Sequence, residues 1–186
     1  MSSTCEMAAS PPETIDVPDG VLSRVREADG DQIALAVRAS LDHLRPWMPW
    51  ATEAAAQVEA QRVRCREAED LWAHGSDYIY ALRRDQAGPV IGTFGLHRRV
   101  GPGAIEVGYW VHADFVGRGY ATAAVAALTH AGSTLADVDR VEIHTDEANV
   151  ISAAIPRRLG YRLDRVDLRP PQAPAESGRL QIWVSS

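Results

Sequence analysis

The sequence has no long apolar stretch. Its longest purely apolar run, the alanine-rich segment from Ala123 to Leu128, is far shorter than the roughly 18 residues that suggest a membrane-spanning helix. The N-terminus also lacks the basic region and the apolar region of a secretion signal. We therefore expect a cytoplasmic protein with no membrane partner.

Cysteine is scarce. The chain has two cysteines, Cys5 near the N-terminus and Cys65 in a polar stretch that should be helical. Their number and spacing give neither a disulfide framework nor a set of metal ligands. We expect two free thiols and no metal. Internal repeats are also missing, which argues against a repeat array.

Excess positive charge is absent as well. The formal net charge of -6 disfavours nonspecific attraction to nucleic acid, so we expect no nucleic-acid partner. The same charge modestly favours the approach of a cationic substrate such as a protonated amine. The composition, 46% hydrophobic and 24% charged, is typical of a globular protein that buries a core.

The length of 186 residues fits one ordinary domain. Residues 1–19 contain Ser, Pro and Asp with little periodicity, and we predict that they form a flexible leader. Residues 20–186 should then form a single domain.

Hydrophobic periodicity predicts the elements of that domain. A strand from Gly20 to Glu27 precedes an amphipathic helix that ends at Leu44, before Pro46. The other expected elements are a helix from about Thr52 to His74, strands at 77–83, 89–96 and 105–111, a helix from Tyr120 to about Ala131, a strand at 141–145, a short helix, and strands at 161–168 and 179–184. The strand–helix–strand unit from 105 to 145 should contain a parallel strand pair.

The segment from Val111 to Ala121 carries most of the chemical information. A strand end is followed by a loop with Gly117 and Gly119 and then by the start of a helix. Glycines let a ligand approach the backbone, and the unpaired amides at a helix N-terminus attract an anion. We expect this loop to hold a pyrophosphate. The alternative is a tight strand-to-helix turn without a ligand.

A dinucleotide-binding turn is another interpretation of the same loop, because Gly117 and Gly119 open a helix and Asp146 follows the next strand. Two features count against it. Thr122 stands where that motif has its third small residue, and residues 112–116 separate the strand from the first glycine.

The loop Gly117–Ala121 resembles the acetyl-CoA pyrophosphate loop of the GNAT superfamily, and residues 106–111 before it resemble the central strand of that family. Downstream, Asn149–Ser152 and Leu159–Tyr161 are similar to the second family motif. The segment His43–Trp50 resembles the RimJ/RimL-like branch, whose members acetylate the N-termini of ribosomal proteins.

This resemblance covers the chain from about residue 20 to the end. It implies the α/β GNAT fold, a mixed and mostly antiparallel sheet with a splayed parallel strand pair, flanked by helices. It also implies acetyl-CoA as cosubstrate. Dimers are common in the family, so a homodimer is a possible partner, but the sequence itself does not give the oligomeric state. The family pattern begins with Gln or Arg where this chain has Val116, which removes one side-chain contact and leaves the backbone amides. The residues that the resemblance assigns to acetyl-CoA are Trp110, Val111, His112, Gly117, Arg118, Gly119, Tyr120, Ala121, Asn149 and Ser152.

Acetylation requires a neutral amine, so a base or a water chain must remove a proton from the acceptor. Glu106 matches the position where many GNAT enzymes carry a catalytic glutamate, which acts directly or through water. The alternative is a solvated or paired strand residue. The resemblance assigns stabilisation of the oxyanion to a backbone amide of the central strand, at Val111.

Many GNAT enzymes place a proton-donating tyrosine seven residues after the asparagine of the second motif, but Pro156 stands there. Ser152, which matches the serine of the RimL-like group, is the expected catalytic replacement. Tyr161 is expected to pack instead. Asn149 should bond the cofactor arm, cap the helix that follows, or do both.

The acceptor is predicted from the aromatic segment that follows the first helix. The segment with Trp47 and Trp50 favours the α-amine of a protein or peptide, and both tryptophans are predicted to bind substrate. One alternative is a small amine, including an aminoglycoside. Another is a noncatalytic acyl-CoA-binding regulatory module, because Val116 and Pro156 depart from the family pattern.

The histidines at 97, 112 and 144 do not have a defined ligand spacing and lie on or beside different predicted strands. We therefore predict surface or packing roles for them, rather than metal binding or acid-base catalysis.

Overall fold

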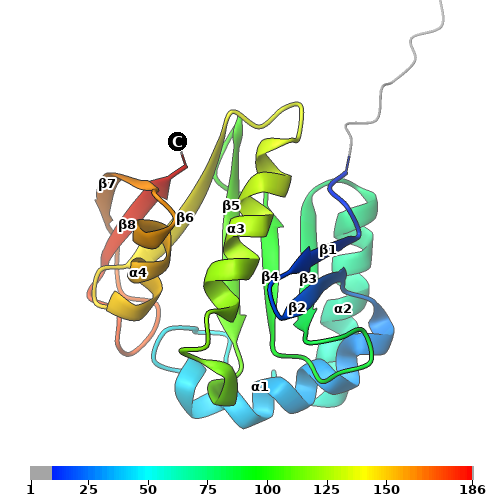
Figure 1. Cartoon of the computed structure of the whole chain (residues 1–186). Helices are drawn as coiled ribbons and strands as arrows, with labels where there is room; N and C mark the ends of the chain where they lie inside the picture. The colour runs from blue at the N-terminus through cyan, green and yellow to red at the C-terminus, as the bar shows by residue number, and fades with distance from the viewer. Residues whose placement is uncertain (1–9, 186) are drawn as a thin grey trace, which may run out of the picture.

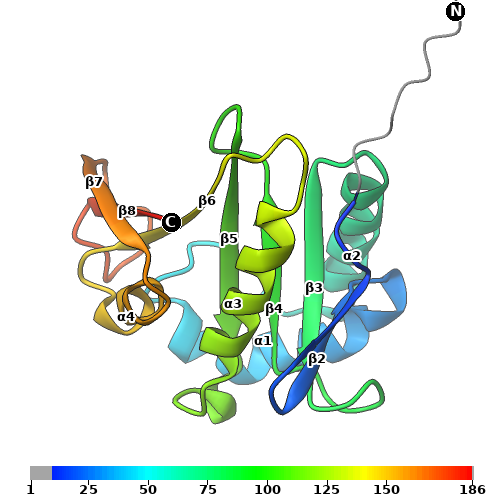
Figure 2. The same ribbon diagram turned by 45° about the horizontal axis from the view of Figure 1, so that its top comes forward.

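The computed structural model describes residues 10–185, which form one sheet with helices on both faces (Figure 1, Figure 2). The elements are β1 (Thr14–Val17), β2 (Gly20–Arg24), η1 (Glu27–Asp29), α1 (Gly30–Leu44), α2 (Val58–Ala73), β3 (Asp77–Arg83), β4 (Gly92–His97), β5 (Ala104–Val111), η2 (Ala113–Phe115), α3 (Tyr120–Ser133), β6 (Arg140–Asp146), α4 (Val150–Arg158), β7 (Arg162–Leu168) and β8 (Arg179–Val184).

The eight strands follow the order β1-β2-β3-β4-β5-β6-β8-β7. Neighbouring strands are antiparallel except β5 and β6, which are parallel and are joined through α3. This arrangement confirms the predicted mixed, mostly antiparallel sheet. Figure 2 shows α3 crossing one face of the sheet, while α1 and α2 lie on the other side.

The parallel pair separates soon after it forms. Strands β5 and β6 pair only from Ala104↔Arg140 to Glu106↔Glu142. Beyond this point β5 continues along β4 to Val111, and β6 continues along β8 to Asp146. Figure 1 shows the two strands diverging. The predicted splayed pair is therefore confirmed.

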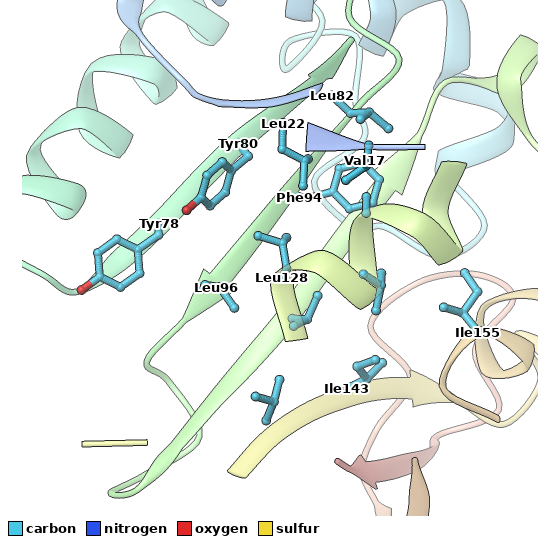
Figure 3. Close-up of a cluster of buried hydrophobic side chains, with 14 of the residues drawn as sticks. Val17, Leu22, Tyr78, Tyr80, Leu82, Phe94, Leu96, Leu128, Ile143 and Ile155 are labelled. Carbon is cyan, nitrogen blue, oxygen red and sulfur yellow. The ribbon is translucent and has the colours of Figure 1, made fainter. Parts of the chain in front are cut away.

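Two apolar clusters pack on opposite faces of the sheet and hold the splayed strands in place. Successive residues of a strand point to opposite faces, so Tyr80 and Leu82 join the cluster under α3 while Ala81 joins the cluster under α1 and α2. Figure 3 shows the larger cluster, whose labelled residues are Val17, Leu22, Tyr78, Tyr80, Leu82, Phe94, Leu96, Leu128, Ile143 and Ile155. Each fully buried leucine-sized side chain contributes about 1.5–3 kcal/mol. Burial of the two clusters therefore stabilises the sheet.

The predicted leader is wrong at its C-terminal boundary. Thr14–Val17 form β1, an edge strand paired with β2 from Thr14↔Ser23 to Val17↔Gly20. The strand is too short to show periodicity, yet Ile15 packs against the larger core and Val17 is part of it. Asp19 lies in the turn between β1 and β2 and has a φ of 59°. Residues 1–9 of the predicted leader lie outside the described residues.

Three other predicted boundaries are also wrong. The strand predicted at 89–96 begins at Gly92. The second helix begins at Val58 rather than Thr52, because residues 52–57 form turns in which Thr52 Oγ1 accepts a hydrogen bond from Ala55 N at 3.1 Å. The strand predicted from Gly20 to Glu27 ends at Arg24, and Glu27 starts the short helix η1.

Candidate functional site

A cavity of about 710 Å³ lies on the face of the sheet that α1 and α2 cover. Its floor is formed by β4, β5 and β6. One wall is the segment 47–50 together with α2, and the opposite wall is the loop between β7 and β8. Ala175 N of that loop donates a hydrogen bond to Pro46 O at 2.9 Å, so the two walls are tied together. The volume lies in the range of small-molecule sites.

The aromatic wall contains both tryptophans that were predicted to bind substrate. Trp47 and Trp50 line the cavity, and the Trp50 ring lies 6.2 Å from the Trp110 ring. The guanidinium of Arg64 lies 5.3 Å from the Trp50 ring, a cation–π contact. The end of α1 fixes the position of the segment 47–50, because Trp47 N and Met48 N both donate hydrogen bonds to Leu44 O.

Glu106 lies in the floor of the cavity, where it is paired with Arg99. Arg99 Nε is 2.7 Å from Glu106 Oε2 and Arg99 Nη2 is 2.8 Å from Oε1, a bidentate ion pair. Burial favours the neutral carboxyl and raises its pKa, but the hydrogen bond and charge of Arg99, with His144 and His97, outweigh burial and lower the pKa below its ordinary value. The structure thus gives Glu106 the paired state that the sequence left as an alternative.

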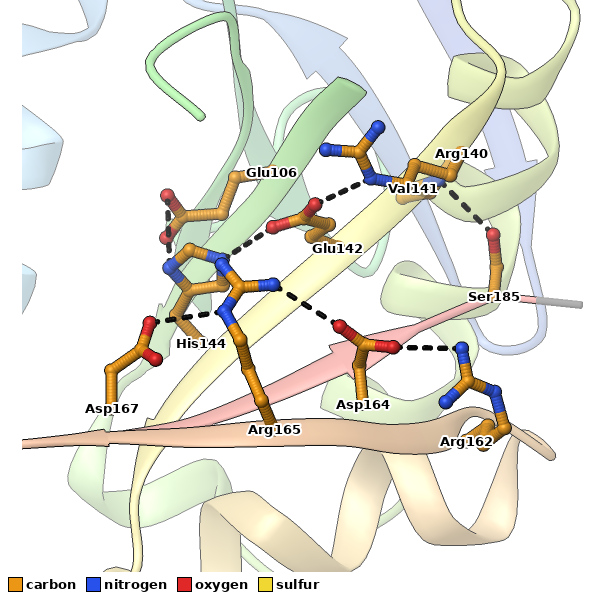
Figure 4. Close-up of polar contacts among 10 residues, drawn as sticks. All are labelled: Glu106, Arg140, Val141, Glu142, His144, Arg162, Asp164, Arg165, Asp167 and Ser185. Carbon is orange, nitrogen blue, oxygen red and sulfur yellow. Dashed lines mark hydrogen bonds and ion pairs between the residues drawn. The ribbon is translucent and has the colours of Figure 1, made fainter. Parts of the chain in front are cut away.

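A histidine and a buried glutamate lie beside Glu106 on β6. Glu142, which is 1% exposed, accepts a hydrogen bond from Arg140 Nε at 2.7 Å, and its other oxygen lies 2.7 Å from His144 Nε2. His144 Nδ1 is 4.0 Å from Glu106 Oε2. Figure 4 shows the side chains of Glu106, His144 and Glu142 turned toward one another. His144 also lines the cavity.

The pairing of Glu142 with His144 was not predicted from the sequence, and the packing role predicted for His144 is incomplete. The spacing of Glu142 and His144 could have indicated the pair, because residues two apart on a strand share a face. Glu142 and His144 therefore had to lie together, and the parallel pairing placed them opposite Glu106. What the sequence does not give is the register that brings the three side chains together.

His97 also belongs to the cavity floor. Its Nδ1 lies 2.7 Å from Asp77 Oδ2. Two glycines make room for the ring, since a Cβ at Gly95 would lie 2.5 Å from His97 Nε2 and a Cβ at Gly108 would lie 3.0 Å from it. The third histidine, His112, does not line the cavity; its Nδ1 accepts a hydrogen bond from Asp114 N at 3.1 Å and caps η2.

Ser152 and Tyr109 meet across the opening between β5 and α4. Tyr109 Oη lies 3.1 Å from Ser152 Oγ, and both residues line the cavity. Burial raises the pKa of the Tyr109 hydroxyl to about 12, while the hydrogen bond with Ser152 lowers it. A tyrosine is therefore present near the predicted Ser152, although it comes from the central strand. Tyr161 is 6% exposed and contacts Thr129 Oγ1 at 2.6 Å, which agrees with the predicted packing role.

Asn149 caps α4, as one of its two predicted roles required. Its Oδ1 accepts a hydrogen bond from Ser152 N at 3.1 Å. Asn149 also lines the cavity, so its amide nitrogen remains available to a ligand there.

The glycine loop lies beyond the cavity, at the C-terminal end of β5. Gly117 and Gly119 have φ values of 73° and 85°, and a Cβ at either would meet no heavy atom within 4 Å among the described residues. The conformation, rather than crowding, requires glycine here. Gly119 is the N-cap of α3, so the amides of Tyr120 and Ala121 open the helix. The Arg118 guanidinium lies 5.3 Å from the Phe115 ring.

The backbone of β5 faces the opening where β6 has turned away. His112 N donates to Ile91 O, which lies just before β4. Hydrogen-bonded and non-hydrogen-bonded pairs alternate along an antiparallel ladder, so every second residue counted back from His112 points its amide toward β4. The amides of Val107, Tyr109 and Val111 therefore point away from β4 and toward the opening. This is the orientation that the predicted role of the Val111 amide requires.

The structure accordingly divides the predicted cofactor residues into two groups. Trp110, Asn149 and Ser152 line the cavity. The others lie along the end of β5 and the start of α3, and are Val111, His112, Gly117, Arg118, Gly119, Tyr120 and Ala121.

The dinucleotide interpretation does not fit Asp146. Its carboxylate accepts hydrogen bonds from Ser177 N at 2.9 Å, Gly178 N at 3.0 Å and Ala148 N at 2.9 Å. Burial raises its pKa, but these backbone bonds and the Ser177 hydroxyl outweigh burial and lower it. Both oxygens of Asp146 therefore fasten the loop between β7 and β8, which accounts for the residue without a ribose.

Residues 10–185 contain no group of three His, Cys, Asp or Glu side chains arranged to hold a metal ion. Within the same range no helix has the length and apolar character needed to cross a membrane.

Comparison with known families gives a match over most of the chain. Residues 21–162 match the family described as "Acetyltransferase (GNAT) domain". No curated protein matches the sequence.

Several solved structures share the fold. The ribosomal-protein-S5-alanine acetyltransferase of Vibrio fischeri has a TM-score of 0.83 and 18% identity, covering 92% of this chain and 95% of that chain. RimJ of Mycobacterium smegmatis, solved in complex with CoA-disulfide, has a TM-score of 0.81 and 23% identity, covering 95% and 90%. The microcin C7 self-immunity acetyltransferase MccE, solved with acetyl-CoA and AMP, has a TM-score of 0.83 and 18% identity, covering 94% and 96%.

Proposed function

The chain belongs to the GNAT acetyltransferase family and is an acetyl-CoA-dependent N-acetyltransferase, and we propose that its acceptor is the α-amine at the N-terminus of a protein or peptide. The observation that carries the proposal is the cavity of about 710 Å³, which extends from the aromatic wall at 47–50 to the opening between β5 and β6. A chain terminus can enter this slot and bring its amine to the opening. The similarity to a ribosomal-protein-S5-alanine acetyltransferase and to RimJ supports the same acceptor class.

Acetyl-CoA would occupy the other side of the opening. The amides of residues 117–121 would bind its pyrophosphate, aided by the N-terminal end of the α3 dipole. The pantetheine arm would run along the free edge of β5 toward Asn149. This path brings the thioester to the floor of the cavity, close to Tyr109 and Ser152.

The proposed reaction is direct attack of the amine nitrogen on the thioester carbon. The C–N bond forms, the C–S bond breaks, and the Val111 amide stabilises the negative charge on oxygen. The hydrogen-bonded pair Ser152–Tyr109 can pass a proton to the departing thiolate. Cys65 lines the cavity but is buried, and burial with the nearby charges of Asp29, Glu69 and Glu27 raises its pKa to about 12. A covalent acetyl-cysteine step is therefore disfavoured.

A small amine is the second candidate acceptor. The microcin C7 self-immunity acetyltransferase has the same TM-score, 0.83, as the ribosomal-protein enzyme of Vibrio fischeri. Enzymes with different names thus share the fold to the same degree, so neither overall similarity nor membership of the family identifies the acceptor.

The test is mass spectrometry after incubation with acetyl-CoA and a panel of acceptors. The panel contains peptides with a free N-terminus, the same peptides with a blocked N-terminus and an internal lysine, polyamines and aminoglycosides. We expect one added acetyl group on the free N-terminal peptides. The chain contains no lysine, so self-acetylation on lysine cannot confuse the result.

Two outcomes would contradict the proposal. Transfer to polyamines or aminoglycosides alone would assign the small-amine class. Binding of acetyl-CoA in calorimetry without transfer to any acceptor of the panel would favour the noncatalytic acyl-CoA-binding module.

A further inference from the structure

We propose that His144, rather than Glu106, takes the proton from the acceptor amine, and that Glu142 positions its ring. The inference rests on the proposed acetyl transfer, but not on which amine is the acceptor. It comes from the arrangement of three side chains on the floor of the cavity, where β5 and β6 make their last pair, Glu106↔Glu142.

The contacts of His144 orient its two nitrogens. Nε2 lies 2.7 Å from a carboxylate oxygen of Glu142, which is 1% exposed. An ionised carboxylate only accepts hydrogen bonds, so the ring must donate from Nε2. In the neutral ring Nδ1 then carries the lone pair. Nδ1 lies on the side of Glu106, 4.0 Å from its Oε2, and His144 lines the cavity.

Glu106 is poorly suited to the same task. Both of its oxygens accept hydrogen bonds from Arg99, at 2.7 and 2.8 Å. Protonation would give up this ion pair, so the carboxylate is a weak base. Imidazole is the side chain that most often acts as a general base.

The other charged groups around His144 are largely neutralised by partners. On the β4 side, Arg99 pairs with Glu106 and His97 pairs with Asp77. On β6, Arg140 pairs with Glu142 and Asp146 is bonded to loop amides. On β7, Arg165 pairs with Asp164 and Asp167 beside this group. The cavity is also lined by Arg64 and Glu67 of α2, and by Arg169 after β7, which pairs with Glu176.

The proton balance of the step is complete. The acceptor arrives as an ammonium ion, and one proton moves to His144 Nδ1 and then to solvent. The neutral amine forms the C–N bond as the C–S bond breaks and its electron pair leaves on sulfur. The further proton lost by the nitrogen ends on that sulfur, which gives the free thiol of CoA.

The first experiment compares His144→Gln with Glu106→Gln in the full chain. We measure kcat and kcat/KM against pH with the best acceptor of the panel, and the Kd of acetyl-CoA by calorimetry. His144→Gln should lower kcat by about 10²- to 10⁴-fold, without a change in acetyl-CoA affinity, and the remaining rise of kcat/KM with pH should follow the ionisation of the acceptor amine alone. Glu106→Gln should lose less activity and keep the pH profile of the wild type.

The reverse result would overturn the proposal. If His144→Gln keeps kcat within about threefold of the wild type and retains the pH profile, His144 is not the base. His130→Gln is the matched control, because His130 is exposed near the end of α3 and does not line the cavity. Glu142→Gln tests positioning, because the variant loses the carboxylate that accepts from Nε2. It should lower kcat and weaken the preference of the neutral His144 ring for the Nε2-protonated form in NMR, whereas a wild-type tautomer and kcat would remove Glu142 from the proposal.

A second measurement does not depend on turnover. Long-range ¹H–¹⁵N NMR of the full chain reports which ring nitrogen of His144 carries the proton, with His144→Gln used for assignment. We expect the neutral ring to be protonated on Nε2. Protonation on Nδ1 would overturn the proposal even if the panel contained no acceptor, whereas an inactive enzyme with the Nε2 form would contradict only the proposed function.

Discussion

At the scale of single residues, the Arg99–Glu106 pair decides how the floor of the cavity responds to acid. Because the folded-state pKa of Glu106 is lowered, the stability that ionised Glu106 contributes is fully present above its ordinary value of 4.5. That stability is lost as the pH falls through the folded-state pKa. Without Arg99, burial would dominate and raise the pKa instead.

We therefore expect Arg99→Gln to destabilise the protein most at neutral pH. The loss should lie near the lower end of about 1.5–3 kcal/mol for a hydrogen bond to a charged group, because solvent screens the Arg99 side chain, which is 60% exposed. The difference from the wild type should shrink as the pH falls from 7 to 4, where Glu106 becomes protonated in the variant. Urea unfolding at both pH values measures this.

The control for this prediction is a double-mutant cycle with Glu106→Gln. Once residue 106 is uncharged, replacing Arg99 should lower the free energy of unfolding much less, and this decrease should be the same at pH 7 and pH 4. A cost that is the same in both backgrounds would show that Arg99 acts by packing its aliphatic stem rather than by pairing.

At the scale of elements, the glycine loop connects the central strand with α3 through two left-handed residues. Replacing Gly119 with Ala places a Cβ in open space, but at a φ of 85°. The strain of about 1–2 kcal/mol is relieved if the loop shifts, and the amides that open α3 then move. We expect Gly119→Ala to raise the Kd of acetyl-CoA about tenfold or more in calorimetry, since 1.4 kcal/mol is tenfold in binding.

Gly101→Ala provides the matched control for the loop. Gly101 has a φ of 102°, and a Cβ there also meets no heavy atom within 4 Å among the described residues. It lies in the turn between β4 and β5, at the opposite end of β5 from the glycine loop. Gly101→Ala should destabilise the fold about as much as Gly119→Ala and leave the Kd of acetyl-CoA unchanged. An equal loss of affinity in both variants would show that the glycine loop is not the binding element.

The order of elements could be predicted because hydrophobic periodicity and turn residues mark most of them. The exceptions have local causes. Strand β1 has four residues, too few to display alternation, and is held by pairing with β2. Residues 52–57 have the composition of a helix but are held in turns by Thr52 and by the side chain of Gln61, which donates to Ala55 O at 2.6 Å. Both depend on contacts that a local pattern does not contain.

The candidate site could be predicted only in part, for a related reason. Motif spacing placed Glu106, Asn149 and Ser152, and the structure brings all three to one cavity. Their partners come from other strands or from the loop after β4, so the pairing of Glu106 with Arg99 and the contact of Ser152 with Tyr109 depend on sheet register and side-chain direction. Those are tertiary properties, which the spacing of residues in the chain does not specify.

At the scale of the whole molecule, the sheet consists of two parts, β1–β5 and β6–β8–β7. Direct pairing between them is limited to residues 104–106 of β5 and 140–142 of β6. Further links are the α3 crossover and the hydrogen bond from Ala175 N to Pro46 O. Acetyl-CoA in the proposed position would contact both parts, since the glycine loop belongs to the first and Asn149 to the second.

Hydrogen exchange measured by mass spectrometry tests this bridging. We expect saturating acetyl-CoA to slow exchange in both 107–121 and 145–155, whereas ADP, which can reach only the pyrophosphate loop, should slow it in 117–121 alone. At 100 times its Kd the ligand should also stabilise the fold by about 2.7 kcal/mol, which raises Tm by roughly 5–10 °C for a chain of this size. Protection confined to the first part with acetyl-CoA would show that the ligand does not cross the opening, and Gly119→Ala at the same ligand concentration should show weaker protection in both segments.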